Sequence, residues 1–266
     1  MKKTAKKLFT ALLMMSWLPG VAGAQSDSWV IYGGYNHAVG NFARVDLDNN
    51  DWAFTSNTSN KGGSGMGFDL GVAYRMPISK RGRLNLVFSA ELFYNNPSFR
   101  VKYKSAMAML EASSNFRKVS ITNPNFINVP ILGGLHYEFP MSERFNLYLE
   151  AQAGVAICKV TKRGAEFIGG NEPIEVGNQD FYDYIYTDRF YTSPSLALHC
   201  AVGLVGQKRF MMDLGLWHMG ELTLEGYENF EYRTSPTTDT RYSGGMAFTL
   251  GRVSPLILAL RVGYRL

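Results

Sequence analysis

Ionisable side chains recur at the polar positions of segments in which polar and apolar residues alternate. They are Asp69, Arg75, Glu91, His136, Glu138, Glu150, His199, Asp213, Arg261 and Arg265. Carboxylates, guanidinium groups and imidazoles can pair as ions, transfer protons or bind a charged ligand. Which of these they do depends on whether the fold brings them together in a closed space.

A second set of residues has the chemistry of an acyl-ester hydrolase. Ser195 and His199 fall on one face of a predicted strand, and Glu138 lies two residues from His136. Four residues along a strand span about 13 Å, however, which is too far for a serine–histidine hydrogen bond. The histidines also lack the spacing of metal ligands. We therefore assign no catalytic residue and no metal site, and we expect neither a cofactor nor an enzyme.

The elements that must position these residues are indicated by an alternation of period two. Between residues 66 and 76 the large apolar side chains are Met66, Phe68, Leu70, Val72, Tyr74 and Met76, and none lies between them. A strand with one apolar face produces this pattern and a helix does not. The same pattern recurs at 84–94, 128–139, 145–155, 195–204, 210–217 and 256–266, and less cleanly at 28–39. The sequence therefore predicts eight strands long enough to cross a hydrocarbon layer when tilted.

The connections between these segments alternate between short and long. Short turns are expected at 78–83, 140–144 and 207–209, and long loops at about 39–63, 95–126, 158–190 and 222–241. This asymmetry is typical of an antiparallel up-and-down transmembrane β-barrel with short periplasmic turns and long extracellular loops. Ten strands are the alternative, because Ser254-Pro255 interrupts the last alternating stretch. Alternation at 98–104 and 221–232 predicts strands that continue as a protruding sheet.

The first 24 residues have the layout of a cleaved secretory signal. A lysine-rich start is followed by a short apolar core and by Ala22-Gly23-Ala24, which predicts cleavage before Gln25 and a single barrel domain over 25–266. Four lysines leave with the signal, so the remaining 23 basic and 22 acidic residues nearly balance. This balance gives no argument for nucleic-acid binding. Cys158 and Cys200 should point to opposite faces and stay free thiols.

Three features favour a membrane barrel over a soluble one. Aromatic residues cluster at the ends of the apolar faces, as expected of a belt at the membrane interface. They are Tyr74, Tyr94, Tyr137, Phe139, Phe145, Phe210 and Tyr264. The opposite faces mix small residues with charged ones, which suits the inside of a narrow barrel. No charged residue falls on the apolar faces of the seven clean strands, where it would be costly in lipid.

Together with the signal, three stretches give the chain a family resemblance. Tyr32-Gly33-Gly34-Tyr35, the segment NVPILGGLHYEF at 128–139 and the alternating C-terminus resemble the outer-membrane β-barrel domain family. That family includes the PorT-like porin proteins of Bacteroidetes and, more distantly, OmpX and the OmpA barrel. The resemblance implies a place in the outer membrane among lipid and lipopolysaccharide, insertion by the outer-membrane assembly machinery, and an accessory role in protein export as one option. The chain ends on Leu266 where such barrels frequently end on Phe.

The leading functional hypothesis is a non-enzymatic barrel that acts through its loops. An eight-stranded barrel is just wide enough inside for side chains, so the ten ionisable residues should form an ion-pair network that plugs the lumen. The tyrosine-rich segment at 181–191 is the candidate interaction surface toward an extracellular or export-complex protein, with Tyr182, Tyr184, Tyr186 and Tyr191. A narrow porin-like transport pore is the main alternative, and a lipid-modifying barrel enzyme ranks last.

Overall fold

The structure is a computed structural model that describes residues 27–43, 63–79, 82–170, 172–176, 179–206, 209–237 and 240–266. The predicted signal segment, residues 1–24, lies outside these residues. Within the described ranges, neither helix is long and apolar enough to cross a membrane.

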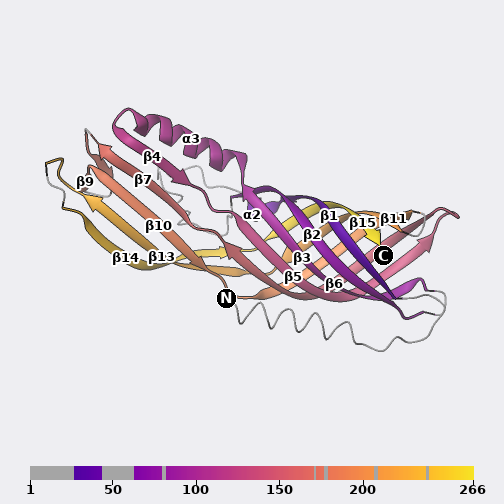
Figure 1. Ribbon diagram of the computed structural model, residues 1–266. Helices are drawn as coiled ribbons and strands as arrows, with labels where there is room; N and C mark the ends of the chain where they lie inside the picture. The colour runs from indigo at the N-terminus through magenta and orange to yellow at the C-terminus, as the bar shows by residue number, and fades with distance from the viewer. Residues whose placement is uncertain are drawn as a thin grey trace.

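A closed antiparallel barrel forms one end of the molecule (Figure 1). Within the described residues its eight strands are β1 (Ser28–Ala38), β2 (Ser64–Pro77), β3 (Leu84–Pro97), β5 (Phe126–Pro140), β6 (Phe145–Val160), β11 (Ser195–Gly206), β12 (Phe210–Met219) and β15 (Leu256–Arg265). Pairing of β1 with β15 closes the wall. The predicted fold class and strand number are confirmed, and barrel strands end and begin on either side of the three predicted short turns. The free ends of β1 and β15 lie on the side of these turns.

A second sheet, called the projecting sheet below, extends from the other end of the barrel. Its order is β14 (Tyr242–Val253), β13 (Leu222–Arg233), β10 (Asp183–Tyr191), β7 (Arg163–Gly170) and β4 (Phe116–Thr122). Each of its strands is joined to a barrel strand by a few residues, in the order in which those barrel strands neighbour one another. The pairing register carries over, since Phe126 pairs with Val160 in the barrel and Thr122 with Gly164 above it.

The projecting sheet tests two predictions made from the sequence, the strand at 221–232 and the ten-strand barrel. The strand expected at 221–232 is present as β13. The ten-strand alternative is wrong, because residues 242–253 pair with β13 in the projecting sheet and leave the barrel at eight strands.

The strand predicted at 98–104 is wrong, because these residues begin the helix α3 (Phe99–Ser113). Ser98 caps the helix, and its Oγ accepts a hydrogen bond from the backbone N–H of Val101. The residues that follow, 106–111, are Ala, Met and Leu with one Glu, all good helix formers. The helix packs against β4 at the edge of the projecting sheet. The remaining described elements are α2 (Gly40–Ala43), β8 (Ile174–Val176) and β9 (Gln179–Phe181).

The outer wall of the barrel is apolar. Leu70, Leu214 and Leu260 are among many outward side chains that are about half exposed, with nothing in the described chain to cover them. Among the described outward positions of the barrel strands, only Lys159 at the end of β6 is a Lys, Arg, Asp or Glu. Aromatic pairs such as Phe210–Tyr264 and Tyr137–Phe139 mark the turn side of the wall. This distribution is that of a barrel surrounded by lipid.

Candidate functional site

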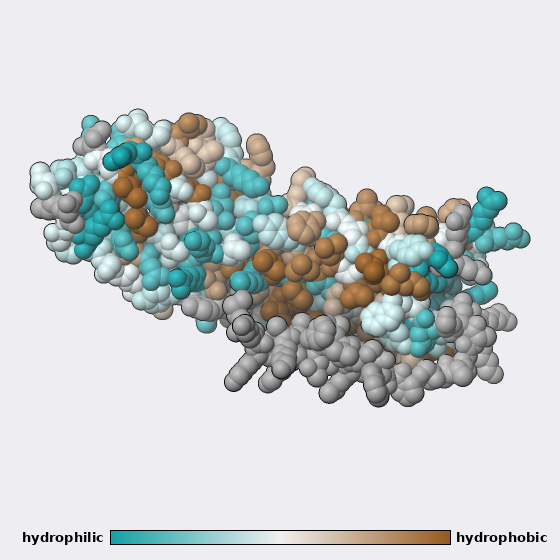
Figure 2. All heavy atoms as spheres, viewed as in Figure 1, coloured by the Kyte–Doolittle hydropathy of each residue, from teal (hydrophilic) through white to brown (hydrophobic). Residues whose placement is uncertain are grey.

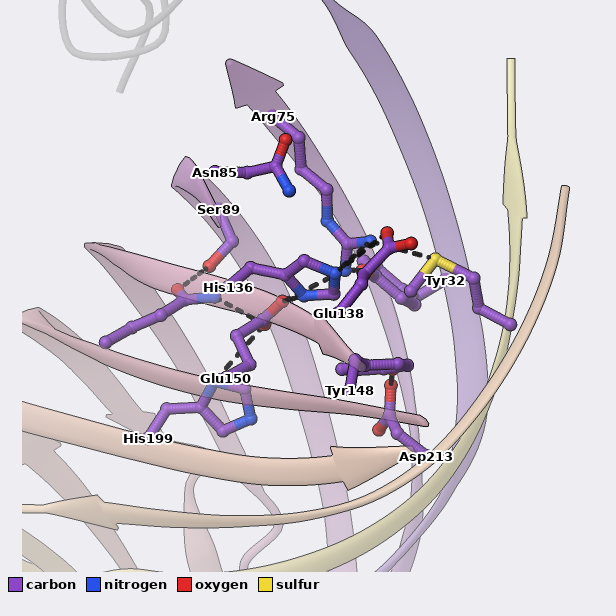
Figure 3. A network of polar contacts seen from close by, with 12 residues as sticks. Tyr32, Arg75, Asn85, Ser89, His136, Glu138, Tyr148, Glu150, His199 and Asp213 are labelled. Carbon is purple, nitrogen blue, oxygen red and sulfur yellow. Dashed lines mark hydrogen bonds and ion pairs between the residues drawn. The ribbon is translucent and has the colours of Figure 1, made fainter. Parts of the chain in front are cut away.

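The turn-side half of the lumen holds a buried ion-pair network centred on Arg75 and Glu150. The Arg75 Nη2 atom donates a hydrogen bond to Glu150 Oε2 over 2.9 Å and another to the Tyr32 hydroxyl (Figure 3). The ring nitrogens of His136 lie 3.0 Å from Glu150 Oε2 and 3.2 Å from Glu138 Oε1. These residues come from four strands, β1, β2, β5 and β6, so the network ties one side of the barrel together across its interior.

A second cluster surrounds the guanidinium of Arg261, which is 1% exposed. Its Nε and Nη2 atoms donate to the two Asp213 oxygens over 2.8 and 3.1 Å, and Nη1 donates to Glu91 Oε1 over 2.9 Å. The Tyr148 hydroxyl donates to Asp213 over 2.6 Å. Buried charges of this kind are tolerated only when each has partners, so every member of the cluster depends on the others.

The structure places all ten predicted lumen residues inside the barrel, but it does not bond them equally. Arg265 reaches Glu138 near the turn-side mouth. Asp69 is buried near the Arg261 cluster, and one of its carboxylate oxygens, Oδ1, is buried without a hydrogen-bond partner among the described residues. His199 Nδ1 lies 3.8 Å from Glu150 Oε1, and the ring makes no side-chain hydrogen bond within the described chain. Asp69 and His199 therefore lie at the edge of the network and are bonded to it less fully than the other predicted residues.

His199 is held mainly by packing. Its ring stacks on Trp217 with centroids 4.1 Å apart and planes 14° from parallel. Gly215 makes this possible, because a Cβ atom at that position would overlap the Trp217 ring. The arrangement fixes the imidazole between the polar and apolar halves of the lumen.

Sequence reasoning missed several members of the network. Tyr32, Ser89, Tyr148 and Gln152 all contribute hydrogen bonds inside the lumen. Tyr148 and Gln152 share the inward parity of Glu150, so that parity could have identified them. Tyr32 lies in the opening strand, where both faces carry apolar or glycine residues and the parity is ambiguous.

The loop-side half of the lumen is mainly apolar, with Asn36, Asn95 and Asn128 also buried there. The sequence analysis did not predict this apolar filling. Its buried side chains include Phe42, Phe93, Phe126, Trp217, Met219 and Ile257. Phe42 comes from α2, the short helix after β1, and its ring packs edge-on against Phe126 with centroids 5.0 Å apart. The lumen is thus filled by an ion-pair layer toward the turns and by an aromatic layer toward the loops.

The structure places the residues that the sequence analysis considered for catalysis and metal binding. Ser195 and His199 lie on one strand without a hydrogen bond between them, as the spacing indicated. Among the described residues, no group of three His, Cys, Asp or Glu side chains is placed to hold a metal ion. The predicted free thiols are confirmed, with Cys158 buried in the lumen and Cys200 exposed on the outer wall.

The predicted tyrosine surface lies in the projecting sheet. Tyr186 is buried and Tyr184 half-buried on the face toward α3, beside Phe167. Burial raises the pKa of Tyr184 to about 12, so this phenol stays neutral. Tyr182 is half-buried beside β10, and the side chain of Tyr191 lies outside the described part of the chain. The rings of Tyr184 and Tyr186 thus serve mainly as packing within the sheet.

Asp183 fixes the end of the projecting sheet far from the barrel. It accepts hydrogen bonds from Arg233 Nε over 3.0 Å and from the backbone N–H of Gly169 over 2.7 Å. Burial alone would raise the pKa of this carboxyl, but the bonds from Arg233 and Gly169 hold it below its ordinary range. One carboxylate thereby joins β7, β10 and β13.

The apolar wall, the closed ladder and the filled lumen define a small transmembrane β-barrel with an extended extramembrane sheet. No protein-family model matches the chain, and no curated protein matches it by sequence.

Similar solved structures are outer-membrane proteins of low sequence identity. Ail, the attachment invasion locus protein of Yersinia pestis, is 13% identical with a TM-score of 0.38, over 91% of this chain and 100% of that chain. Neisserial surface protein A is 12% identical with a TM-score of 0.41, over 92% and 99%. A major outer membrane protein from Thermus thermophilus is 11% identical with a TM-score of 0.41, over 91% and 100%.

Proposed function

We propose that this chain is a non-enzymatic outer-membrane protein whose barrel anchors the projecting sheet outside the cell as a recognition surface for a protein partner. The observation that carries the proposal is the continuity of the two sheets. Five barrel strands continue beyond the lipid-facing wall, and three of the four continued pairs keep their register, while the lumen beneath them is filled. The strands of the projecting sheet have 7 to 12 residues, which corresponds to roughly 25–40 Å of additional strand length.

The contents of the lumen argue against a transport pore. Both Arg75 and Arg261 are buried and paired across the interior, and the aromatic layer with Phe42 lies above them. Opening a path for solutes would require these groups to separate in a confined space, where an unpaired charge is costly. A filled lumen leaves the extramembrane surface as the part able to meet a partner.

The two edges of the projecting sheet are unequal, which supports a recognition role. The β4 edge is short, carries Arg117 and Lys118, and lies beside α3. The β14 edge has no Lys or Pro between 242 and 249, and within the described residues its free side pairs with no strand. Natural proteins usually protect edges, because an open edge can accept a strand from another chain.

The proposal is tested first by ion conductance and cell fractionation. Purified protein in planar bilayers should show no discrete conductance steps, and the processed chain should fractionate with the outer membrane. Discrete steps of reproducible size would support the pore alternative instead. Deletion of the gene should leave lipid A and phospholipid profiles unchanged, whereas an altered acylation pattern would point to the enzyme alternative.

The recognition role is tested by photo-crosslinking from the open edge. A photoreactive amino acid at Ser243, on β14, should give discrete protein adducts in intact cells. The matched control carries the same group at Leu214, which faces lipid on the barrel wall. Adducts no different from those of the control would count against the recognition role. The resemblance to PorT-like proteins remains a prediction that identification of an export component among such adducts would support.

A further inference from the structure

The outward face of α3 carries large apolar side chains that stay largely exposed in the described chain, where the rings of Phe99 and Tyr103 stack on each other. Phe99, Tyr103, Met107 and Leu110, called the α3 stripe here, are 80%, 57%, 38% and 66% exposed. The opposite face packs toward β4 through small or medium residues, Val101, Ser105 and Ala112, which are buried. Figure 2 shows hydrophobic atoms along the upper ridge where Figure 1 places α3. A helix on a water-exposed sheet normally has the reverse arrangement.

The spacing of the exposed residues indicates what could cover them. Three residues of the stripe, Phe99, Tyr103 and Leu110, together with the exposed Ala106, which lies outside the stripe, follow one another at intervals of four, three and four residues. This is the heptad spacing with which one helix packs against another. Since α3 is already folded against β4, a partner helix would meet a preformed seam.

A lipid surface fits this face less well. The helix runs alongside β4, away from the barrel (Figure 1). Leu110 therefore lies about 16 Å farther along the axis than Phe99. An interfacial helix instead lies in the plane of the membrane, with its whole apolar face at one depth.

The charged residues beside the stripe indicate which charges a partner helix should carry. Arg100 and Lys102 flank it on α3, and Arg117 is exposed on the adjoining strand β4, whereas Lys118 is paired with Glu166. Glu111, near the end of the helix, is the exposed acidic residue among the described residues of α3. Two copies in one membrane would bring their own α3 helices together in parallel, with these cations facing one another. A helix with acidic residues beside its apolar seam would instead find opposite charges.

We propose that the α3 stripe binds an amphipathic α-helix of another protein, one with a heptad apolar seam and acidic flanking positions. The inference rests on the recognition role proposed above and names the chemistry of one partner. It concerns a different edge from β14, so the Ser243 crosslinking result can fail or succeed independently of it.

The test uses the full chain in lipid nanodiscs and labelled synthetic helices read by fluorescence anisotropy. One peptide of three heptads has leucine at the seam and Glu at the flanking positions, a second has Lys at those positions, and a third keeps Glu but has Ser at the seam. The Glu peptide should bind at least about tenfold more tightly than either of the others. Empty nanodiscs measure binding to the lipid itself.

Variants assign the binding to α3. The double substitution Phe99→Ser with Leu110→Ser should weaken binding of the Glu peptide at least about tenfold, and Arg100→Glu with Lys102→Glu should reverse the preference between the charged peptides. Tyr227→Ser, at an exposed aromatic of β13, is the matched control and should change nothing. Absence of binding by the Glu peptide, equal binding of the Glu and Lys peptides, unchanged binding by the stripe variant, or self-association of the free protein through α3 would each overturn the proposal.

Discussion

Five of the eight barrel strands continue into the five strands of the projecting sheet, yet the two regions use their side chains in opposite ways. In the barrel, apolar residues such as Leu214 point outward and ions such as Arg261 point inward. In the projecting sheet, aromatic residues such as Tyr186 pack toward α3, and the exposed positions include Lys118 and Glu166. The backbone pairing passes from one region to the other with the same register. The surrounding solvent, rather than the pairing, therefore decides which face of each strand is apolar.

The largest effect should come from breaking an ion pair inside the barrel. Arg261→Met leaves Asp213 and Glu91 buried without their cation, and loss of one partner from a buried pair typically costs about 3–5 kcal/mol. Urea unfolding in lipid, followed by the gel mobility of the folded barrel, measures this loss. Adding Asp213→Leu and Glu91→Leu to the same variant should restore most of the stability. Failure of that restoration would mean that Arg261 acts by packing alone.

Placing a charged residue on the outer surface of each region tests most directly whether the barrel faces lipid and the projecting sheet faces water. Leu214→Arg, near the middle of β12, should destabilise the protein by about 2–4 kcal/mol because the new cation faces lipid. Asn229→Arg, exposed on β13 of the projecting sheet, should change stability by less than about 0.5 kcal/mol. Equal costs at the two positions would contradict the assignment of one region to lipid and the other to water.

A smaller and local effect is expected at Asp183. Asp183→Asn removes charge-assisted hydrogen bonds to Arg233 and should loosen β10 and β13 by about 1–3 kcal/mol without affecting the barrel. The pKa of this carboxyl is lowered in the fold, so its stabilisation is present above the ordinary aspartate value of about 3.9 and is lost as the pH falls through the folded pKa. Hydrogen exchange at about pH 7 and below about pH 4 should show this loss in the wild type and not in the variant.

The smallest effect is expected for the exposed ion pair of Lys118 and Glu166. Both side chains are about half exposed, so Lys118→Ala should cost no more than about 0.5 kcal/mol. Comparing the stability lost in Lys118→Ala with that lost in Arg261→Met measures how much burial increases the contribution of an ion pair to stability. A cost above about 2 kcal/mol at Lys118 would show that the β4 edge is less hydrated than its exposure indicates.

The barrel could be predicted from sequence because lipid and lumen impose opposite demands on every second residue. From this alternation the eight strands, the positions of the three turns and the inward direction of all ten ionisable lumen residues could be predicted. The alternation is a poorer guide outside the barrel, where lipid no longer faces one side of each strand. The run of Phe99, Val101 and Tyr103 alternates like a strand, but α3 has apolar residues on both faces, so periodicity could not distinguish the two structures. Phe42 lies in a four-residue helix inside a long loop, and no periodic pattern marks it as a plug.

The continuity of strand pairing between the two sheets has a mechanical consequence. A partner pulling on the projecting sheet along its strands would load many interstrand hydrogen bonds together in shear, because those bonds lie across the pulling direction. The load would pass along β7 into β6 and along β13 into β12, with only two residues intervening in each case. Tension applied outside the cell would therefore be transmitted to the barrel wall rather than absorbed by a flexible tether.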